Sequence, residues 1–190
     1  MIDLIAEAKL VQDYFEENAW SFCFIGGLAL LRWGEPRLTR DVDATLFVGF
    51  GNEERFVDAL LSRFRGRLAE TRSFALLRRV ALLLTPGGDG LDVSLGGFPF
   101  EEAMVLRASK APFAPGIELR TCSAEDLVVL KAFASRDQDW IDVGNVAIRQ
   151  LGRLDWPAIY QRLTPLAEAK EEPEILGRLR AIEAGAGGSA

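Results

Sequence analysis

The sequence predicts an α/β fold (α+β) in which a mixed sheet flanked by helices is followed by a C-terminal helical region. As far as residue 121, short apolar runs typical of strands alternate along the chain with amphipathic stretches typical of helices. From Ser123 onward, no stretch alternates like a strand, and apolar residues recur at helical spacing. We therefore expect an α/β core over 1–121, a helical bundle over 122–184 and a flexible glycine-rich tail over 185–190.

Five elements are expected in the first part of the core. A helix comes first, followed by a short apolar strand that Gly26-Gly27 breaks sharply and by a brief helix that ends at Gly34-Glu35-Pro36. A strand with alternating apolar residues and a second full helix follow. In chain order, these elements cover residues 2–18, 22–25, 28–33, 40–48 and 53–63.

The rest of the core is predicted to contain a hairpin, because strand-like runs stop at a stretch rich in turn residues and resume after it. A short helix and an edge strand then complete the core. In chain order, we expect strands over 68–71 and 74–85, the turn over 86–90, a strand over 91–95, the helix over 99–108 and the edge strand over 116–120.

The C-terminal region begins with a helix-capping signature at Ser123, which has acidic residues in the turn that follows it. The helix that it starts is expected to reach residue 134. Three further stretches have helical patterning, over 140–150, 156–169 and 173–183.

The chain contains no histidine among its 190 residues. A Ser-His-Asp triad, a Cys-His pair and a His-ligated zinc site are therefore excluded within it. Its two cysteines have no paired spacing, and Cys23 sits in an apolar run typical of a core. Any catalysis must use carboxylates, lysine, arginine, tyrosine, hydroxyl groups or a hard metal ion.

The net charge of −6 argues against a generally basic surface for nucleic acid. Arginines gather between residues 63 and 79, where they form either a local basic patch or the solvated faces of strands and helices. The acidic, amphipathic first residues are unlike a signal peptide, and no apolar run is long enough to span a bilayer. We expect a cytoplasmic protein with no membrane partner.

Asp41-Val42-Asp43 places two carboxylates two residues apart on an expected strand. Side chains alternate along a strand, so both carboxylates point to one face while Val42 points to the other. Two anions side by side repel each other unless a positive charge lies between them. A divalent cation meets that need, and oxygen ligands without histidine favour Mg²⁺ or Mn²⁺ over zinc.

A third carboxylate would complete such a metal site, and Asp89 and Asp92 are the candidates. Asp89 lies in the turn over 86–90. Asp92 alternates with Leu91 and Val93, which form a buried face, so it points to the open face as the first two carboxylates do. We favour Asp92 as the third ligand and as the general base that accepts a proton from an attacking hydroxyl.

Gly26-Gly27 joins an expected strand to a short helix. Glycines let a phosphate approach the backbone, and the amides at a helix N-terminus attract anions, so this turn is a candidate phosphate cradle. Arg37 and Arg40 lie in the connection that follows. They either neutralise phosphate or are solvated loop charges.

The stretch FIGGLALLRWGEPRLTRDVDATL resembles the nucleotidyltransferase signature of the AbiEii/AbiGii toxin-like group, within the DNA polymerase β-like nucleotidyltransferase superfamily. That signature is Gly-Gly or Gly-Ser, a short helix and then Arg-x-Thr-x-Asp-x-Asp. The matching residues are Gly26, Gly27, Arg37, Thr39, Asp41 and Asp43. The resemblance implies a nucleotidyltransferase fold and a metal-binding carboxylate pair.

A second stretch, LKAFASRDQDWIDV, is similar to a later element of that group. The resemblance implies that Lys131 contacts the nucleotide triphosphate and that Asp139 or Asp142 has a structural or catalytic role. These aspartates are three residues apart and share a helix face, so they either orient Lys131 or Arg136 toward the site or form a helix-to-helix ion-pair cluster. Two residues depart from the pattern, since Gly27 replaces a common serine and Gln138 a usual lysine.

We therefore expect a nucleotidyltransferase that moves a nucleotide monophosphate from an NTP to an acceptor hydroxyl on RNA, protein or a small molecule. The resemblance also implies a toxin with a cognate antitoxin as partner. The acidic composition argues against tRNA, because a phosphate-rich acceptor needs a positive path. The alternative is a catalytically silent nucleotide-binding or interaction module that keeps the fold.

Overall fold

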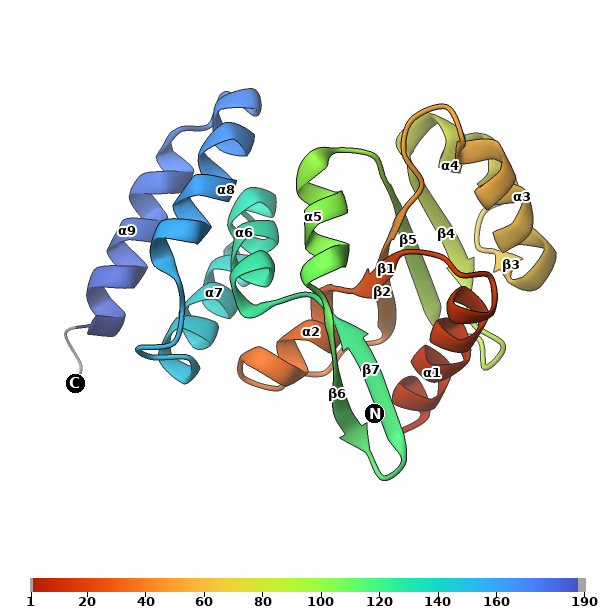
Figure 1. Cartoon of the computed structure of the whole chain (residues 1–190), viewed down its shortest axis with the longest axis horizontal. Helices are drawn as coiled ribbons and strands as arrows, with labels where there is room; N and C mark the ends of the chain where they lie inside the picture. Colours follow the sequence, from red (N-terminus) through yellow and green to blue (C-terminus); the bar gives the residue numbers. More distant parts are fainter. Residues whose placement is uncertain (1, 188–190) are drawn as a thin grey trace. The chain divides into compact units, whose positions relative to one another are not determined.

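The computed structural model describes residues 2–187 and confirms the mixed α/β class (Figure 1). Its residues group into two compact units, and each is described by itself. One unit contains residues 2–28 and Leu38–Cys122. The other contains Ala29–Arg37 and residues 123–187. The sequence suggested a division near residue 121, with no sign that Ala29–Arg37 groups with the C-terminal helices.

The first unit is built on a seven-stranded mixed sheet with the strand order β3-β4-β5-β2-β1-β7-β6. Its strands are β1 (Phe22–Phe24), β2 (Asp41–Phe47), β3 (Arg65–Gly66), β4 (Val80–Leu84), β5 (Gly90–Gly96), β6 (Ser109–Ala114) and β7 (Ile117–Thr121). Its helices are α1 (Ile2–Glu17), α3 (Glu53–Arg63), α4 (Thr71–Arg78) and α5 (Pro99–Arg107), with the start of α2 (Gly26–Trp33). Strand β2 pairs with β5 in parallel and with β1 in antiparallel orientation.

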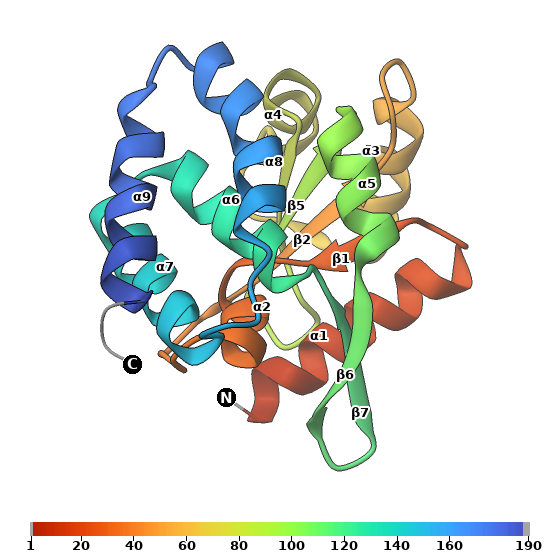
Figure 2. The same ribbon diagram turned by 60° about the vertical axis from the view of Figure 1, so that its left-hand side comes forward.

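One face of the central strands forms the apolar core of this unit. Alternation along β2 buries Val42, Ala44 and Leu46 completely, and Leu91 and Val93 of β5 lie on the same face. Helix α1 packs on this side of the sheet (Figure 2). The centroid of its Phe15 ring lies 5.1 Å from that of the Phe22 ring of β1. The opposite face of these strands carries Asp41, Asp43 and Thr45 of β2 and Asp92 of β5. This face carries the candidate site.

The sequence prediction was wrong between residues 68 and 79, where it placed two strands. Residues Thr71–Arg78 form helix α4. The Thr71 hydroxyl accepts a hydrogen bond from the Leu68 amide at 2.9 Å and donates one to the Leu68 carbonyl at 2.7 Å, which turns the chain into the helix. Arg79 ends it in the left-handed region at φ 55°. The apolar run Ala75–Leu77 fits either periodicity, and tertiary packing decides it.

The predicted edge strand over 116–120 is also corrected. It corresponds to β7, an internal strand that lies between β1 and β6, and β6 is the edge. Strand β6 contains Pro112, and its register shifts between Pro112 and Ala114. Proline removes a ladder donor, so a proline and a bulge are features of edge strands. The proline hid this strand from sequence reasoning.

The second unit is helical. After the end of α2, it contains α6 (Ala124–Ala134), α7 (Asp137–Arg149), α8 (Trp156–Ala169) and α9 (Glu174–Gly187). The capping prediction at Ser123 is confirmed, because its hydroxyl accepts a hydrogen bond from the Asp126 amide at 3.1 Å. The expected flexible tail is wrong for residues 185–187, which continue α9, and residues 188–190 lie outside the described residues.

Candidate active site

Three carboxylates share the open face of β2 and β5. Asp43 is the register partner of Asp92, and Asp41 is the partner of Gly90. Parallel partners point to the same side, so Asp41, Asp43 and Asp92 lie on the face opposite the buried Val42 and Leu91. Asp89 precedes β5, in the turn that the Thr85 and Asp89 backbones close. The strand register therefore brings Asp92, and not Asp89, beside the Asp41–Asp43 pair.

Two glycines give these carboxylates room. A Cβ atom at Gly26 would lie 2.1 Å from Oδ2 of Asp43, and one at Gly90 would lie 2.0 Å from Oδ1 of Asp41. Gly26 also has a φ of +54°, which side-chain-bearing residues rarely adopt. Sequence reasoning assigned Gly26 to phosphate binding. In the structure, its missing side chain leaves space for a carboxylate.

Gly27 and Thr39 of the Gly-Gly signature lie close together in the first unit, near the starts of α2 and β2. A Cβ atom at Gly27 would lie 2.4 Å from Oγ1 of Thr39, so the turn and the segment before β2 are in close contact. The Thr39 hydroxyl donates to the Asp41 carbonyl at 3.3 Å, and the Ile25 amide donates to the Asp43 carbonyl at 2.9 Å. Arg40 is exposed at the end of this segment. These contacts fix the backbone that presents the carboxylates.

Arg67 contacts two of the three carboxylates, and sequence reasoning missed this role. Its Nη2 lies 2.6 Å from Oδ1 of Asp92, and its Nη1 lies 3.8 Å from Oδ1 of Asp41. The arginine stood out only as one member of the run between residues 63 and 79. No spacing rule connects it with Asp92, because the contact depends on how β3, β4 and β5 pair.

Burial has the largest effect on the pKa of Asp92 and raises it; the Arg67 guanidinium acts against this and the negative charge of Asp41 acts with it, so the pKa stays above its ordinary value. The side chain of Asp92 is 31% exposed, so it is reachable from solvent. Among the described residues, no three or more acidic, cysteine or histidine side chains are gathered as a ready ligand cage for a metal ion. The carboxylates thus share a face without converging on one point.

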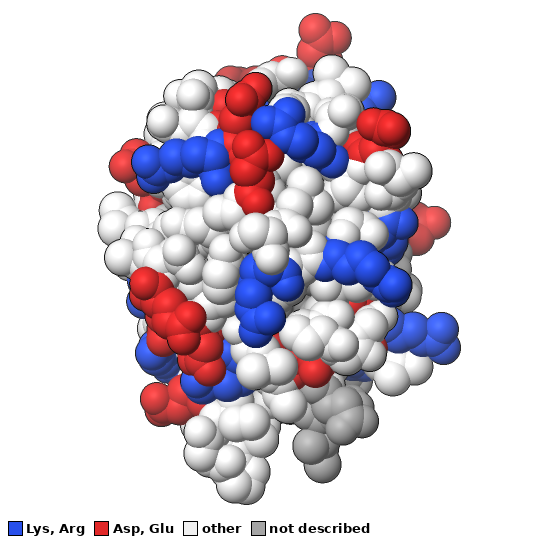
Figure 3. Space-filling model, turned by 90° about the vertical axis from the view of Figure 1, so that its right-hand side faces the viewer, with Lys and Arg blue, Asp and Glu red and all other residues white. Residues whose placement is uncertain are grey.

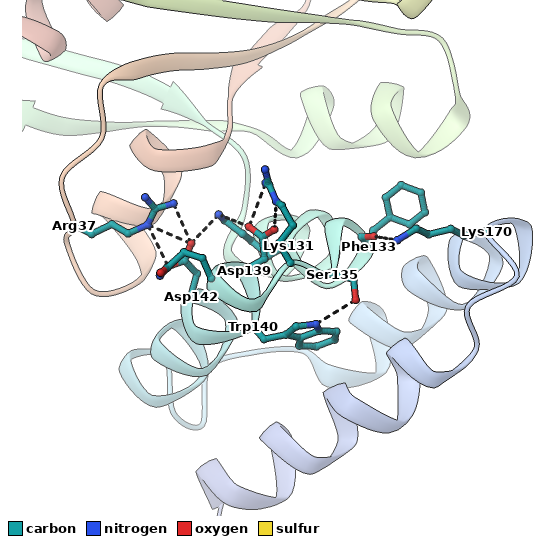
Figure 4. Close-up of polar contacts among 10 residues, drawn as sticks. Arg37, Lys131, Phe133, Ser135, Asp139, Trp140, Asp142 and Lys170 are labelled. Carbon is teal, nitrogen blue, oxygen red and sulfur yellow. Dashed lines mark hydrogen bonds and ion pairs between the residues drawn. The ribbon is translucent and has the colours of Figure 1, made fainter.

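The second unit contains a buried ion-pair network around Lys131 (Figure 4). The Lys131 ammonium lies 2.8 Å from Oδ1 of Asp139 and 2.7 Å from Oδ2 of Asp142, and the side chains are 8%, 2% and 1% exposed, respectively. Arg37 reaches the same Asp142 carboxylate at 3.3 Å. Helix α7 supplies both aspartates from one face, because they are three residues apart.

Burial and the neighbouring cations act in opposite directions on the carboxylates of this network. Burial raises the pKa of Asp139, but the hydrogen bonds from Arg136 and Lys131, together with the positive charges of these two residues, leave that pKa below its ordinary value. Asp142 follows the same pattern, with Lys131 and Gln138 as its hydrogen-bond donors. Both carboxylates are therefore ionised near neutral pH and satisfy the Lys131 charge. An additional role of Lys131 toward a triphosphate stays a prediction.

The arginine-rich stretch does not form a purely basic patch. Arg72 pairs with Asp58 at 2.7 Å and with Glu54 at 3.6 Å, and Arg79 pairs with Glu53. On the face drawn in Figure 3, basic and acidic side chains are interspersed. For Arg72, the structure therefore favours the predicted solvated helix face over a basic patch for nucleic acid.

No protein-family model matches this chain, and a comparison with curated proteins gives no significant match. In the described part of the chain, no helix combines the length and the apolar character needed to cross a bilayer.

Three solved structures that are similar to the chain are a nucleotidyltransferase-like protein, an antibiotic adenylyltransferase and an antibiotic-resistance factor. An antigenic nucleotidyltransferase-like protein from Paracoccidioides brasiliensis is 18% identical, with a TM-score of 0.49 over 94% of this chain and 92% of that one. The lincosamide antibiotic adenylyltransferase LnuA, solved with lincomycin, is 14% identical, with a TM-score of 0.48 over 74% and 94%. The antibiotic-resistance factor ANT(2'')-Ia is 15% identical, with a TM-score of 0.47 over 97% and 91%.

Proposed function

We propose that this chain is a nucleotidyltransferase that moves a nucleotide monophosphate from an NTP to an acceptor hydroxyl. One observation carries the proposal. Asp41, Asp43 and Asp92 share one sheet face across two parallel strands, beside the Gly26-Gly27 turn that begins a helix. Paired carboxylates next to a strand-to-helix turn suit phosphoryl chemistry, which depends on positioning and charge stabilisation.

In the proposed reaction, the acceptor oxygen bonds to the α-phosphorus of the NTP. The bond from that phosphorus to pyrophosphate breaks, and the hydroxyl proton passes to a carboxylate. We assign the proton acceptor to Asp92, which faces Asp43 across the strands. The amides at the start of α2 are assigned to the phosphate oxygens, because helix N-termini attract anions. Arg40, exposed just before β2, is assigned a supporting charge for the same phosphates.

We propose Mg²⁺ or Mn²⁺ as the cofactor, held by Asp41, Asp43 and Asp92. The donor set fits by chemistry, since three carboxylates without histidine match the oxygen preference of hard cations. When bound, such a cation would neutralise the acidic face and the phosphates of the nucleotide. The three carboxylates do not converge in the present arrangement, so binding requires them to draw together and Arg67 to give way.

The acceptor is proposed to be RNA, a protein or a small molecule. A toxin role with a cognate antitoxin follows only from the resemblance in the sequence. Expression of the wild-type chain in a bacterial host tests that role, because a toxin should arrest growth and an Asp43→Asn variant should not. Equal growth of both strains would contradict it.

The alternative function is a catalytically silent nucleotide-binding module. One observation favours it, namely that Arg67 already neutralises Asp92 and Asp41 where an active site needs a cation. A silent module should bind NTP without transferring any part of it.

The test is Mg²⁺-dependent labelling with each of the four α-labelled NTPs, offered with total RNA, lysate protein, the chain itself and a panel of hydroxyl-bearing antibiotics. Transfer that requires Mg²⁺ and is lost in Asp43→Asn would support the proposal. Tight NTP binding without transfer to any acceptor would favour the silent module instead. NTP binding is measured separately by equilibrium dialysis.

A further inference from the structure

Arg67 is held in place by the backbone of the sheet. It follows β3, and its amide donates to the Leu82 carbonyl at 2.9 Å, which continues the β3–β4 pairing by one residue. Leu82 of β4 is in turn the register partner of Asp92. Arg67, Leu82, Asp92 and Asp43 therefore follow one another across the sheet, from the end of β3 through β4 and β5 to β2.

The side chain of Arg67 reaches over that row to the carboxylates. It meets Asp92 at 2.6 Å and Asp41 at 3.8 Å, and it is 33% exposed. A Cβ atom at Gly90 would lie 2.9 Å from Nη1 of Arg67 and 2.0 Å from Oδ1 of Asp41. The absence of a side chain at Gly90 is therefore what lets guanidinium and carboxylate share this space. The contact is therefore supported by the backbone pairing of Arg67 and by the space at Gly90, unlike a chance contact between flexible surface side chains.

We propose that Arg67 is an internal counter-ion that competes with a divalent cation for Asp92 and Asp41. The inference rests on the proposed function for the identity of the competing ligand. A guanidinium and a metal ion both seek the carboxylate oxygens, so a cation can bind Asp92 only as Arg67 releases it. Arg67 is a positioning residue in this account. It keeps the acidic face neutralised in the free protein and leaves it when the cation binds.

The first test compares Mn²⁺ affinity in the wild-type chain and in Arg67→Gln, measured from the electron paramagnetic resonance signal of free Mn²⁺. Removing the competitor should tighten Mn²⁺ binding by about five-fold, the order expected for a partly exposed ion pair. Arg67→Lys keeps the charge and should bind nearly as the wild type does. The matched control is Arg72→Gln, since Arg72 pairs with Asp58 and Glu54 of α3 and should leave the affinity unchanged.

Unchanged or weaker Mn²⁺ binding in Arg67→Gln would overturn the inference, and so would an equal gain in Arg72→Gln. Absence of Mn²⁺ binding in both the wild type and Arg67→Gln would overturn it as well. None of these outcomes decides the proposed function, because that proposal is judged by label transfer. If the wild-type chain transfers label but Arg67→Gln binds Mn²⁺ no more tightly than the wild type, the proposed function is supported and the counter-ion role of Arg67 is contradicted.

A second measurement uses the wild-type chain alone, so it does not depend on how the variant folds. Nuclear magnetic resonance of the arginine Nε–Hε groups should show one signal, assigned to Arg67, that shifts as Mg²⁺ is added, while the signal of Arg72 stays in place. A fixed Arg67 signal at saturating Mg²⁺ would overturn the inference.

Discussion

Asp43 and Asp92 lie opposite each other on the parallel strands β2 and β5, although a helix, a strand, a second helix and another strand separate them in the chain. Parallel pairing puts both carboxylates on the face that the core does not use. Asp41 joins them because it is two residues before Asp43 on the same strand. This relationship leads to the first prediction.

Asp41→Asn and Asp43→Asn should each reduce nucleotidyl transfer to background without loss of stability. Each change removes one of several like charges from a shared face, so repulsion falls and the folded state loses no apolar contact. Label transfer and urea unfolding are measured on the same preparations. Full activity in either variant would contradict the proposed mechanism, whereas an unfolded variant would contradict the placement of that carboxylate on the open face.

Gly26→Ala should disrupt the site through Asp43. The new Cβ atom would lie 2.1 Å from Oδ2 of Asp43, so the carboxylate must move, and the left-handed backbone should cost about 1–2 kcal/mol of stability. Gly116→Ala is the matched control, because its φ is +75° and nothing lies within 4 Å of the new atom. Both variants should lose stability, but only Gly26→Ala should lose transfer. Normal transfer by Gly26→Ala would refute this role of the glycine.

Lys131→Met should destabilise the chain strongly. The change leaves Asp139 and Asp142 buried without their shared ammonium, and breaking a buried ion pair typically costs about 3–5 kcal/mol. Arg136→Ala is the control on the same carboxylate. The Arg136 side chain is 76% exposed, so its loss should cost no more than about 1 kcal/mol. Urea unfolding at neutral pH measures both. Intact stability together with a raised KM for NTP in Lys131→Met would instead favour a nucleotide contact.

The stability lost in Lys131→Met should depend on pH. The pKa values of Asp139 and Asp142 are lowered in the folded protein, so their stabilisation is fully present above the carboxyl pKa of the unfolded chain. This stabilisation is lost as the pH falls through the lowered pKa values that the two carboxyl groups have in the folded protein. The difference in unfolding free energy between the wild type and Lys131→Met should therefore be widest near neutral pH and narrow below about pH 4. A difference that stays constant with pH would contradict the assignment.

Local chemistry explains what could be predicted from the sequence. Alternation along a strand placed Asp41, Asp43 and Asp92 on an open face, and a capping pattern located the start of α6 at Ser123. Both features depend on neighbours in the chain. The register between β2 and β5, by contrast, depends on pairing across the sheet, and only the structure supplied it.

The features that sequence reasoning missed depend on contacts distant in the chain. Arg67 reaches Asp92 through the pairing of three strands, and Arg37 reaches Asp142 across most of the chain length. Helix α4 was mistaken for a strand because its apolar residues fit both periods, and β6 was missed because Pro112 suggests a loop. The sequence suggested Gly26 as part of a phosphate cradle, which stays a prediction, and it gave no sign that the Asp43 carboxylate lies beside this glycine.

The most direct test of the shared carboxylate face compares Asp92→Asn with Asp89→Asn in the Mg²⁺-dependent labelling assay. Only Asp92 is in register with Asp43, whereas Asp89 lies in the turn before β5. We expect Asp92→Asn to lose transfer and Asp89→Asn to retain it at the wild-type level. Transfer retained by Asp92→Asn, or lost equally in both variants, would contradict the assignment of the active site to this face.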